Sequence, residues 1–129
     1  MNRIVEELKK AGVFYLATVE GDQPRVRPFG AVCDIGGSAY ICTNNTKPVY
    51  KQLQANPKAE ISAMLPGGKW LRISGDLVRD DSDASRKAML DDNPSLGGMY
   101  HIGDGIFEVL RLDNAKGLLC SFTAPPEEL

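Results

Sequence analysis

The sequence predicts a mainly β fold with flanking helices, of the α+β class, in which the strands form an antiparallel barrel. Three observations support this prediction. Seven segments have the length and apolar content of strands, and tight turns join most of them, which pairs neighbouring strands in the antiparallel sense. A barrel would leave no exposed sheet edges. The sequence has no alternating strand–helix–strand units and no GxGxxG or Walker loop, so a Rossmann fold is not expected.

In the first half of the chain, a helix is expected at residues 2–11, because apolar residues recur there at helical spacing. Residues 13–19 form an apolar and aromatic run that is too short for a typical helix, which predicts a buried strand. A second strand at 25–33 and a third at 39–43 are separated by a short glycine turn and are expected to pair as a hairpin. Residues 46–54 predict a short helix that its first residue, a threonine, can cap.

In the second half, strands are expected at 58–65 and 70–79, joined by a Pro-Gly-Gly turn. The later strand alternates in polarity, as a half-buried strand does. Residues 82–92 predict a helix with a serine cap and an Asn-Pro stop. The glycine-rich segment 95–105 is expected to be a loop.

The last part of the chain predicts a closing hairpin. Strands are expected at 105–112 and 116–122, with a turn over Asp113 and Asn114. The tail, residues 123–129, is expected either to fray or to lie along a partner.

Composition limits the classes of protein. A chain of 129 residues has the length of one domain, so a single domain over residues 1–129 is expected. No apolar run approaches the roughly 20 residues of a membrane span, and the N-terminus lacks a signal-peptide core, so no membrane partner is expected. A net charge of −2 argues against a surface built for nucleic acid. Three cysteines without a CxxC pair and one histidine make a poor metal set, and a reducing cytoplasm is the expected compartment.

The charges are unevenly distributed along the chain. Between Gln23 and Ala59 the only acid is Asp34, whereas the same stretch holds five basic residues: Arg25, Arg27, Lys47, Lys51 and Lys58. This acid-poor stretch predicts an anion site, provided that the basic groups converge in space.

The sharpest candidate for that site is the segment Thr43-Asn44-Asn45-Thr46-Lys47-Pro48, where a strand is expected to end and a helix to begin. A helix N-terminus offers unpaired amide protons and a partial positive charge to an anion. Arg25 and Arg27 are expected to project from one face of a strand paired with the strand before this segment. Together these groups can surround a phosphate. The alternative is an ordinary helix cap with solvent-facing cations.

Three segments, taken in order, also carry a resemblance. FYLATVEGDQPRVRP, YICTNNTKPVYKQLQANPKAEI and WLRISG resemble the pyridoxamine 5'-phosphate oxidase-like family, whose members are FMN-binding split β-barrels. The similarity extends from Val13 to about Phe122. It implies a homodimer that binds two FMN molecules at the subunit interface.

The resemblance also implies a set of cofactor-binding residues: Arg25, Val26, Arg27, Pro28, Thr43, Asn44, Lys47 and Trp70. The first four would run along the flavin as one strand. The threonine and asparagine would contact the flavin or its ribityl chain, and Lys47, with one of the two arginines, would hold the phosphate. Trp70 would lie near the flavin ring. The helix start here, Thr46-Lys47-Pro48, departs from the serine-arginine-lysine pattern of the vitamin enzymes.

The implied function is an FMN-dependent oxidoreductase acting on a small organic molecule, with no catalytic side chain identifiable. The alternatives are a non-catalytic flavin-binding or stress-response protein, or a split barrel that uses F420 or haem. His101 is the only imidazole available as a haem ligand. True pyridoxamine phosphate oxidases finish with a segment bearing arginine and histidine, and this sequence finishes without one, so vitamin B6 oxidation is not expected.

Overall fold

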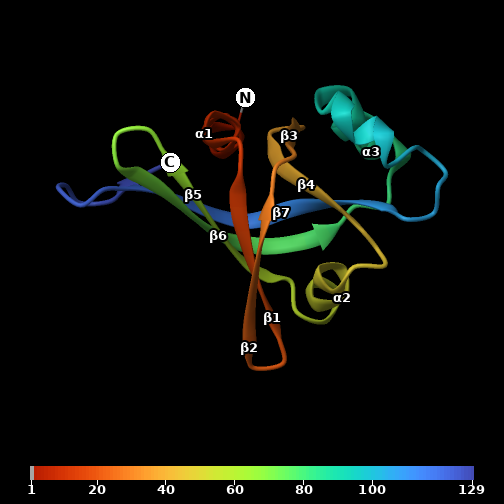
Figure 1. The fold of residues 1–129 in the computed structure, drawn as a ribbon, viewed down its shortest axis with the longest axis horizontal. Helices are drawn as coiled ribbons and strands as arrows, with labels where there is room; N and C mark the ends of the chain where they lie inside the picture. The colour runs from red at the N-terminus through yellow and green to blue at the C-terminus, as the bar shows by residue number, and fades with distance from the viewer. Residues whose placement is uncertain (1) are drawn as a thin grey trace.

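The computed structural model describes residues 2–129. Three helices, one 3-10 turn and eight strands follow one another along the chain (Figure 1). They are, in order, α1 (Arg3–Ala11), β1 (Phe14–Glu20), β2 (Gln23–Phe29), β3 (Val32–Ile35), β4 (Ser38–Asn44), α2 (Pro48–Ala55), β5 (Lys58–Leu65), β6 (Lys69–Arg79), α3 (Asp83–Asp92), η1 (Pro94–Gly98), β7 (Phe107–Cys120) and β8 (Glu127–Glu128).

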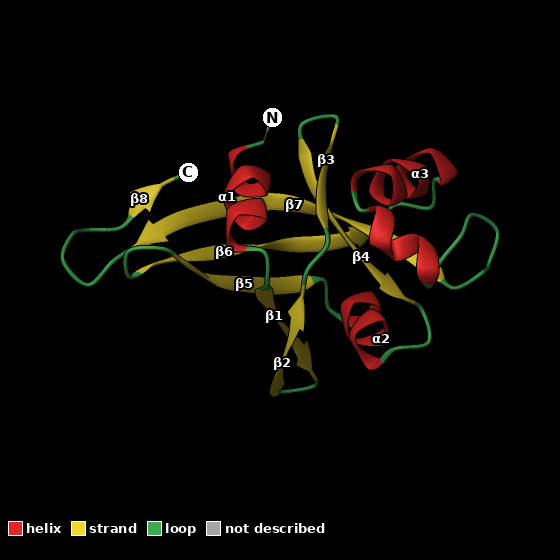
Figure 2. Cartoon of the chain, turned by 45° about the horizontal axis from the view of Figure 1, so that its top comes forward, coloured by secondary structure: helices red, strands yellow, loops and turns green. Residues whose placement is uncertain are grey.

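All strands belong to one antiparallel sheet in the order β2-β1-β5-β6-β7-β4-β3, with β8 pairing on β7 (Figure 2). The two strands at the ends of this order, β2 and β3, are consecutive in the chain and are linked only by Gly30 and Ala31. The sheet therefore bends back toward itself without closing, because β2 and β3 do not pair within the described residues. This open, antiparallel arrangement confirms the predicted split β-barrel.

The expected second strand, 25–33, is in fact two strands. β2 pairs with β1, with Arg27 opposite Leu16, whereas β3 pairs with β4, with Cys33 opposite Tyr40. The prediction that Arg25 and Arg27 lie on a strand paired with residues 39–43 is therefore wrong. Prolines in β2 lack the amide protons that a central strand needs, so β2 is confined to the sheet edge and the chain leaves it after Phe29.

The expected closing hairpin over Asp113 and Asn114 is also wrong, because β7 runs as one strand through both residues. Its first part pairs with β4, and most of its length pairs with β6. Asn114 has a left-handed φ of 53°, and the register shifts there, so that two residues of β7 lie opposite Gly75 alone. A Cβ on Gly75 would stand 2.7 Å from the Asp113 carbonyl oxygen, so only glycine fits. The turn signal thus marks a bulge.

Two further expectations are corrected at the end of the chain. The glycine-rich segment begins as η1 rather than as irregular loop. The tail is not frayed, because β8 pairs with β7 and the Leu129 amide donates to the Gly117 carbonyl oxygen over 3.0 Å.

Buried apolar residues form two clusters. The larger one includes Val5 of α1 and Leu53 of α2, and these side chains pack against β-strand residues such as Leu16 and Ile73. The second joins α3 and η1 to β3, β4 and β7, and consists of Cys33, Tyr40, Cys42, Met89, Leu96, Tyr100, Phe107 and Val109. This second cluster holds η1 beside β4. Both elements line the candidate site described below. No helix among residues 2–129 is long and apolar enough to cross a membrane.

Candidate functional site

The turn between β4 and α2 is built around Asn44. Its Oδ1 accepts hydrogen bonds from the Thr46 amide over 2.9 Å and from the Thr46 hydroxyl over 2.8 Å. The expected threonine cap is therefore wrong, because this hydroxyl is turned back to Asn44. The helix begins one residue later than Lys47, its N-cap, with no side-chain cap and no acidic residue in its first turn. Pro48 has no amide proton, and the Lys47 and Tyr50 amides donate to the Asn44 and Lys47 carbonyl oxygens. The start of α2 therefore offers an anion mainly its partial positive charge rather than a row of free amide protons.

Arg27 is held against α2 and β1. Its guanidinium donates to Gln52 Oε1 over 2.7 Å, to Thr18 Oγ1 over 2.8 Å and to the Leu16 carbonyl oxygen over 3.1 Å. Burial, and next the charge of Arg25, lower the pKa of Arg27 from its ordinary value. This arginine thus has a fixed position.

Arg25 is less constrained. It forms one ion pair, with Glu20 across the β1–β2 turn, over 2.9 Å. The other oxygen of Glu20 accepts from Gln52 Nε2 over 3.2 Å. The bond from Arg25 and then that from Gln52 hold the pKa of Glu20 below its ordinary value, so the carboxylate is ionised at neutral pH. Arg25 therefore pairs with a single carboxylate, and both side chains of this pair are exposed to solvent.

Two hollows open beside the start of α2, and Lys47 lines both. We name the first, of about 490 Å³, the cationic hollow: it is lined by Glu20, Arg25, Val26, Arg27, Lys47, Pro48, Val49 and Gln52. We name the second, of about 360 Å³, the apolar hollow: it is lined by Pro28–Ala31, by Cys42 and Thr43 of β4, by Lys47, and by Asn93, Ser95, Leu96, Met99 and Tyr100. The cationic hollow thus gathers three basic side chains, whereas Lys47 is the one charged residue among those that line the apolar hollow.

Most residues predicted for the site meet at these hollows. Arg25, Val26, Arg27 and Lys47 line the cationic hollow, and Pro28, Thr43 and Lys47 line the apolar one. Asn44 lines neither, because its side chain holds the turn. Trp70 also lines neither, since it lies on β6, where its ring contacts that of Phe122 with the centroids 4.8 Å apart.

Thr43 carries an unusual feature. Its hydroxyl is the one buried side-chain polar atom without a hydrogen-bond partner in the part of the chain that the structure describes. Leaving such a group unpaired costs about 1–3 kcal/mol. Thr43 lines the apolar hollow, although its hydroxyl oxygen is itself buried.

The remaining titratable groups of the apolar hollow are neutral. Burial raises the pKa of the Cys42 thiol to about 12, and burial also raises the pKa of Tyr100. The Tyr100 ring stacks on Phe107, with the centroids 4.8 Å apart. Neither group is ionised near neutral pH, which suits an uncharged aromatic ligand.

Sequence reasoning missed Gln52, Glu20 and Tyr100. Gln52 ties Arg27 to α2, Glu20 neutralises Arg25, and Tyr100 forms part of the apolar wall. The contact of Gln52 with Arg27 joins segments 25 positions apart, so no local pattern marks it, whereas Glu20 pairs with Arg25 across a single turn. An aromatic residue within the glycine-rich segment is the one signal that could have marked Tyr100.

His101 lies away from the hollows. Its side chain is exposed, its Nδ1 lies 3.0 Å from the Ile102 carbonyl oxygen, and its amide donates to Asp104 over 3.1 Å. It lines neither the cationic nor the apolar hollow.

Comparison with known proteins agrees with this fold. The model of the family described as pyridoxamine 5'-phosphate oxidase matches residues 1–114. A NimC/NimA family protein from Clostridium acetobutylicum has 50% sequence identity and a TM-score of 0.95, over 98% of this chain and 89% of that one. No curated protein matches the chain.

Two more distant structures share the fold alone. A pyridoxamine 5'-phosphate oxidase-related, FMN-binding protein from Nostoc punctiforme has 20% identity and a TM-score of 0.59, over 88% of this chain and 76% of that one. A heme-binding protein from Mycobacterium smegmatis has 19% identity and a TM-score of 0.74, over 97% of this chain and 57% of that one. Given the family match over most of its length, the chain belongs to the pyridoxamine 5'-phosphate oxidase family.

Proposed function

We propose that this protein binds FMN at the two hollows and acts as an FMN-dependent oxidoreductase on a small organic molecule. The observation that carries the proposal is the position of Lys47, which lines the cationic hollow together with Arg25 and Arg27 and also lines the apolar hollow, where Thr43 has an unpartnered hydroxyl. FMN combines the same two features, a phosphate and a flat aromatic ring. The FMN-binding relative from Nostoc punctiforme supports this choice of ligand.

The charge of the cationic hollow suits a phosphate monoester. Arg25, Arg27 and Lys47 supply three positive charges and Glu20 one negative charge, which leaves a net charge of +2. A phosphate monoester carries about −1.5 to −2 at neutral pH. The partial positive charge at the start of α2 would add to this attraction.

The apolar hollow would receive the flavin side of the ligand. Pro28 and Tyr100 offer surfaces for a flat ring, and the Thr43 hydroxyl would bond a polar edge of it. Bound FMN supplies hydride and electron transfer, while the protein binds and orients it and limits the access of water. Val26 and Asn44 would support the ligand through their strand and turn.

We propose further that the protein is a homodimer. The outer face of the sheet exposes Tyr15, Val26 and Met64, with exposed fractions of 49%, 67% and 63%. The register places Met64 opposite Trp70 on that face. Exposed apolar side chains gathered on one face support an interface. Trp70 lines neither hollow of its own chain, so its predicted place near a flavin ring requires the partner subunit.

Purification and titration test the proposed ligand. The protein is expected to be yellow, to release FMN on denaturation, and to rebind it with quenching of flavin fluorescence. The double variant R25A/K47A should lose at least tenfold in affinity, because it removes two charged phosphate contacts. Lys51→Ala, which removes an exposed charge from the same helix outside the hollows, is the matched control. Absence of FMN binding by the wild type would refute the proposal.

Catalysis is tested separately. Rapid mixing of the FMN-loaded protein with reduced nicotinamides, followed by small organic acceptors, should show flavin reduction and reoxidation within seconds. A protein that binds FMN but shows neither step is the non-catalytic flavin-binding alternative.

A further inference from the structure

We infer that Glu108 is a positioning residue for the Asn44–Lys47 turn, so that this buried carboxylate sets the affinity of the protein for the phosphate of its ligand. The inference rests on the proposed function, since it concerns the same cationic hollow. Glu108 itself lines neither of the two hollows described above, and it would act through Asn45 and through its place opposite Thr43 in the β4–β7 ladder.

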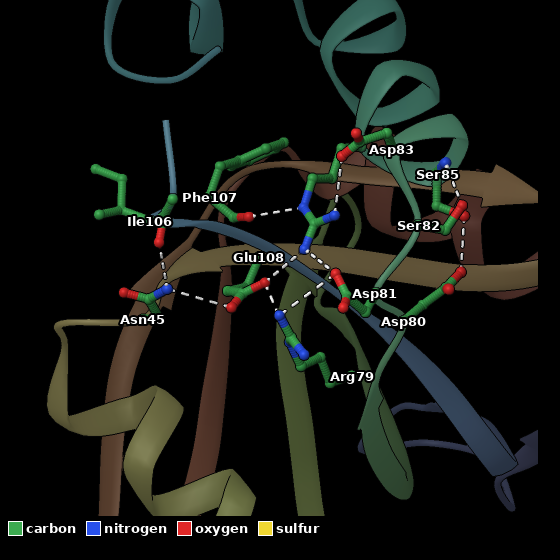
Figure 3. Close-up of polar contacts among 12 residues, drawn as sticks. Asn45, Arg79, Asp80, Asp81, Ser82, Asp83, Ser85, Ile106, Phe107 and Glu108 are labelled. Atoms are coloured by element: carbon green, nitrogen blue, oxygen red, sulfur yellow. Dashed lines mark hydrogen bonds and ion pairs between the residues drawn. The ribbon is translucent and has the colours of Figure 1, made fainter. Parts of the chain in front are cut away.

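Asn45 is anchored on both its backbone and its side chain (Figure 3). Its amide donates to the Ile106 carbonyl oxygen over 2.9 Å. Its side-chain nitrogen donates to the Gly105 carbonyl oxygen over 2.8 Å and to Glu108 Oε2 over 3.2 Å. The turn that ends at Lys47 is thus attached to the beginning of β7, about sixty positions further along the chain.

Glu108 is itself held rigidly. Its Oε1 accepts from Arg86 over 2.8 Å and from Arg79 over 3.2 Å (Figure 3). Its side chain is almost fully buried. Arg86 is fixed in turn by Asp81, by Asp83 and by the Phe107 carbonyl oxygen. We name Asn45, Arg79, Asp81, Asp83, Arg86 and Glu108 the Glu108 cluster. It ties the site turn to the junction of β6 and α3.

The charge state of Glu108 suits this role. Burial by itself raises the pKa of the carboxyl, but the bonds from Arg86, Arg79 and Asn45 outweigh burial, so the pKa of Glu108 lies below its ordinary value. The carboxylate is therefore ionised at neutral pH and accepts from all three partners at once.

The position of Glu108 in the sheet connects it to both parts of the site. In the register it lies opposite Thr43, the residue with the unpartnered hydroxyl. The next pair along the ladder joins Asn44 to Phe107. A substitution in the cluster would therefore displace mainly the end of β4 and the turn that carries Lys47. Strand β2 would move less, because it lies at the far end of the sheet order.

The test compares two ligands and uses one control. Glu108→Gln and Asn45→Ala should each lower the affinity for FMN about tenfold, while the affinity for riboflavin, which lacks the phosphate, should change by less than about twofold. Asp80→Asn is the matched control: its carboxylate accepts from Tyr40 over 2.8 Å and from Ser85 over 2.7 Å, but does not contact the turn. This control should leave the ratio of FMN to riboflavin affinity unchanged.

Amide hydrogen exchange of the ligand-free protein provides a readout independent of FMN. Exchange in residues 44–49 should accelerate in Glu108→Gln and Asn45→Ala, but not in Asp80→Asn. An unchanged FMN-to-riboflavin ratio in both variants, or acceleration spread evenly over the sheet, would overturn the inference. If the wild type bound no FMN, the proposed function would fail instead, and the exchange data would still decide whether the cluster holds the turn.

Discussion

The cationic hollow and the Glu108 cluster use the same kinds of side chain in opposite ways. In the hollow, three cations face one carboxylate, and the Arg25–Glu20 pair is about half exposed on both sides. In the cluster, two arginines face three carboxylates, and Arg86 and Glu108 keep only 11% and 4% of their side-chain surface exposed. An open set of charges with a net charge of +2 can accept an anionic ligand, whereas a cluster built around the buried Arg86–Glu108 pair fixes the chain. Burial and ion pairing therefore distinguish the cationic hollow from the Glu108 cluster, although both contain the same types of residue.

The largest expected difference between the two regions is in stability. Arg86→Ala should lower the free energy of unfolding by about 3 kcal/mol, because it leaves Glu108 buried with fewer partners. Arg25→Ala should leave the urea midpoint nearly unchanged, because its ion pair is exposed. Equal losses in the two variants, measured by urea denaturation, would remove the distinction between the regions.

The pH dependence of stability sharpens the comparison. The pKa of Glu108 is lower in the folded chain than its ordinary value of 4.5, so the unfolded chain binds more protons between the two values. The stability that Glu108 contributes is therefore present above pH 4.5 and is lost as the pH falls through the lower folded value. Glu108→Gln should flatten this acid limb of the stability curve. An acid limb as steep as in the wild type would show that other carboxyls cause it.

A smaller effect is expected at Thr43. Replacing its unpartnered hydroxyl by a methyl group in Thr43→Val should stabilise the ligand-free protein by about 1 kcal/mol. The same change should weaken FMN binding, because the hydroxyl can no longer bond the ligand. Thermal unfolding with and without FMN measures both effects. If the stabilisation persisted undiminished with saturating FMN, the hydroxyl would have no role in binding.

The smallest expected effect is a gain of affinity. Glu20 is the one carboxylate that lines the cationic hollow, and it pairs with Arg25. Glu20→Gln should free this arginine and raise the affinity for FMN two- to fivefold, with the gain falling as salt is added. Asp22→Asn, an equal change of charge in the same turn but outside the hollow, should raise it less. A loss of affinity in Glu20→Gln would mean that Glu20 helps to hold Arg25 in its binding position.

Local patterns predicted much of the fold. The alternation in residues 25–29 placed Arg25 and Arg27 on one face, and the register confirms it, since their partners Thr18 and Leu16 are buried. The break after Phe29 was not predictable, because a strand can continue through any two residues that keep extended angles. Asn114 misled for a similar reason: a left-handed residue fits a hairpin turn and a bulge equally well, and only the position of Gly75 on the neighbouring strand decides between them.

The candidate site was predicted in part. The basic residues and the strand-to-helix turn could be found because charge and capping patterns are local. Gln52 and Glu108 could not, because the residues they contact lie 25 and 63 positions away in the chain. The sequence indicated which groups could bind an anion, and long-range contacts determine which of them are free to do so.

The long strand β7 has a consequence for the order of folding. Until residues 107–120 are synthesised, β4 can pair only with β3, and β6 only with β5. The Asn44–Lys47 turn follows β4 and is anchored to residues at the start of β7, so its anchors leave the ribosome about sixty residues after the turn itself. Pairings this distant in sequence form slowly. The hairpins of the sheet can therefore form before the binding region, which takes shape only once the final long strand is inserted between β6 and β4.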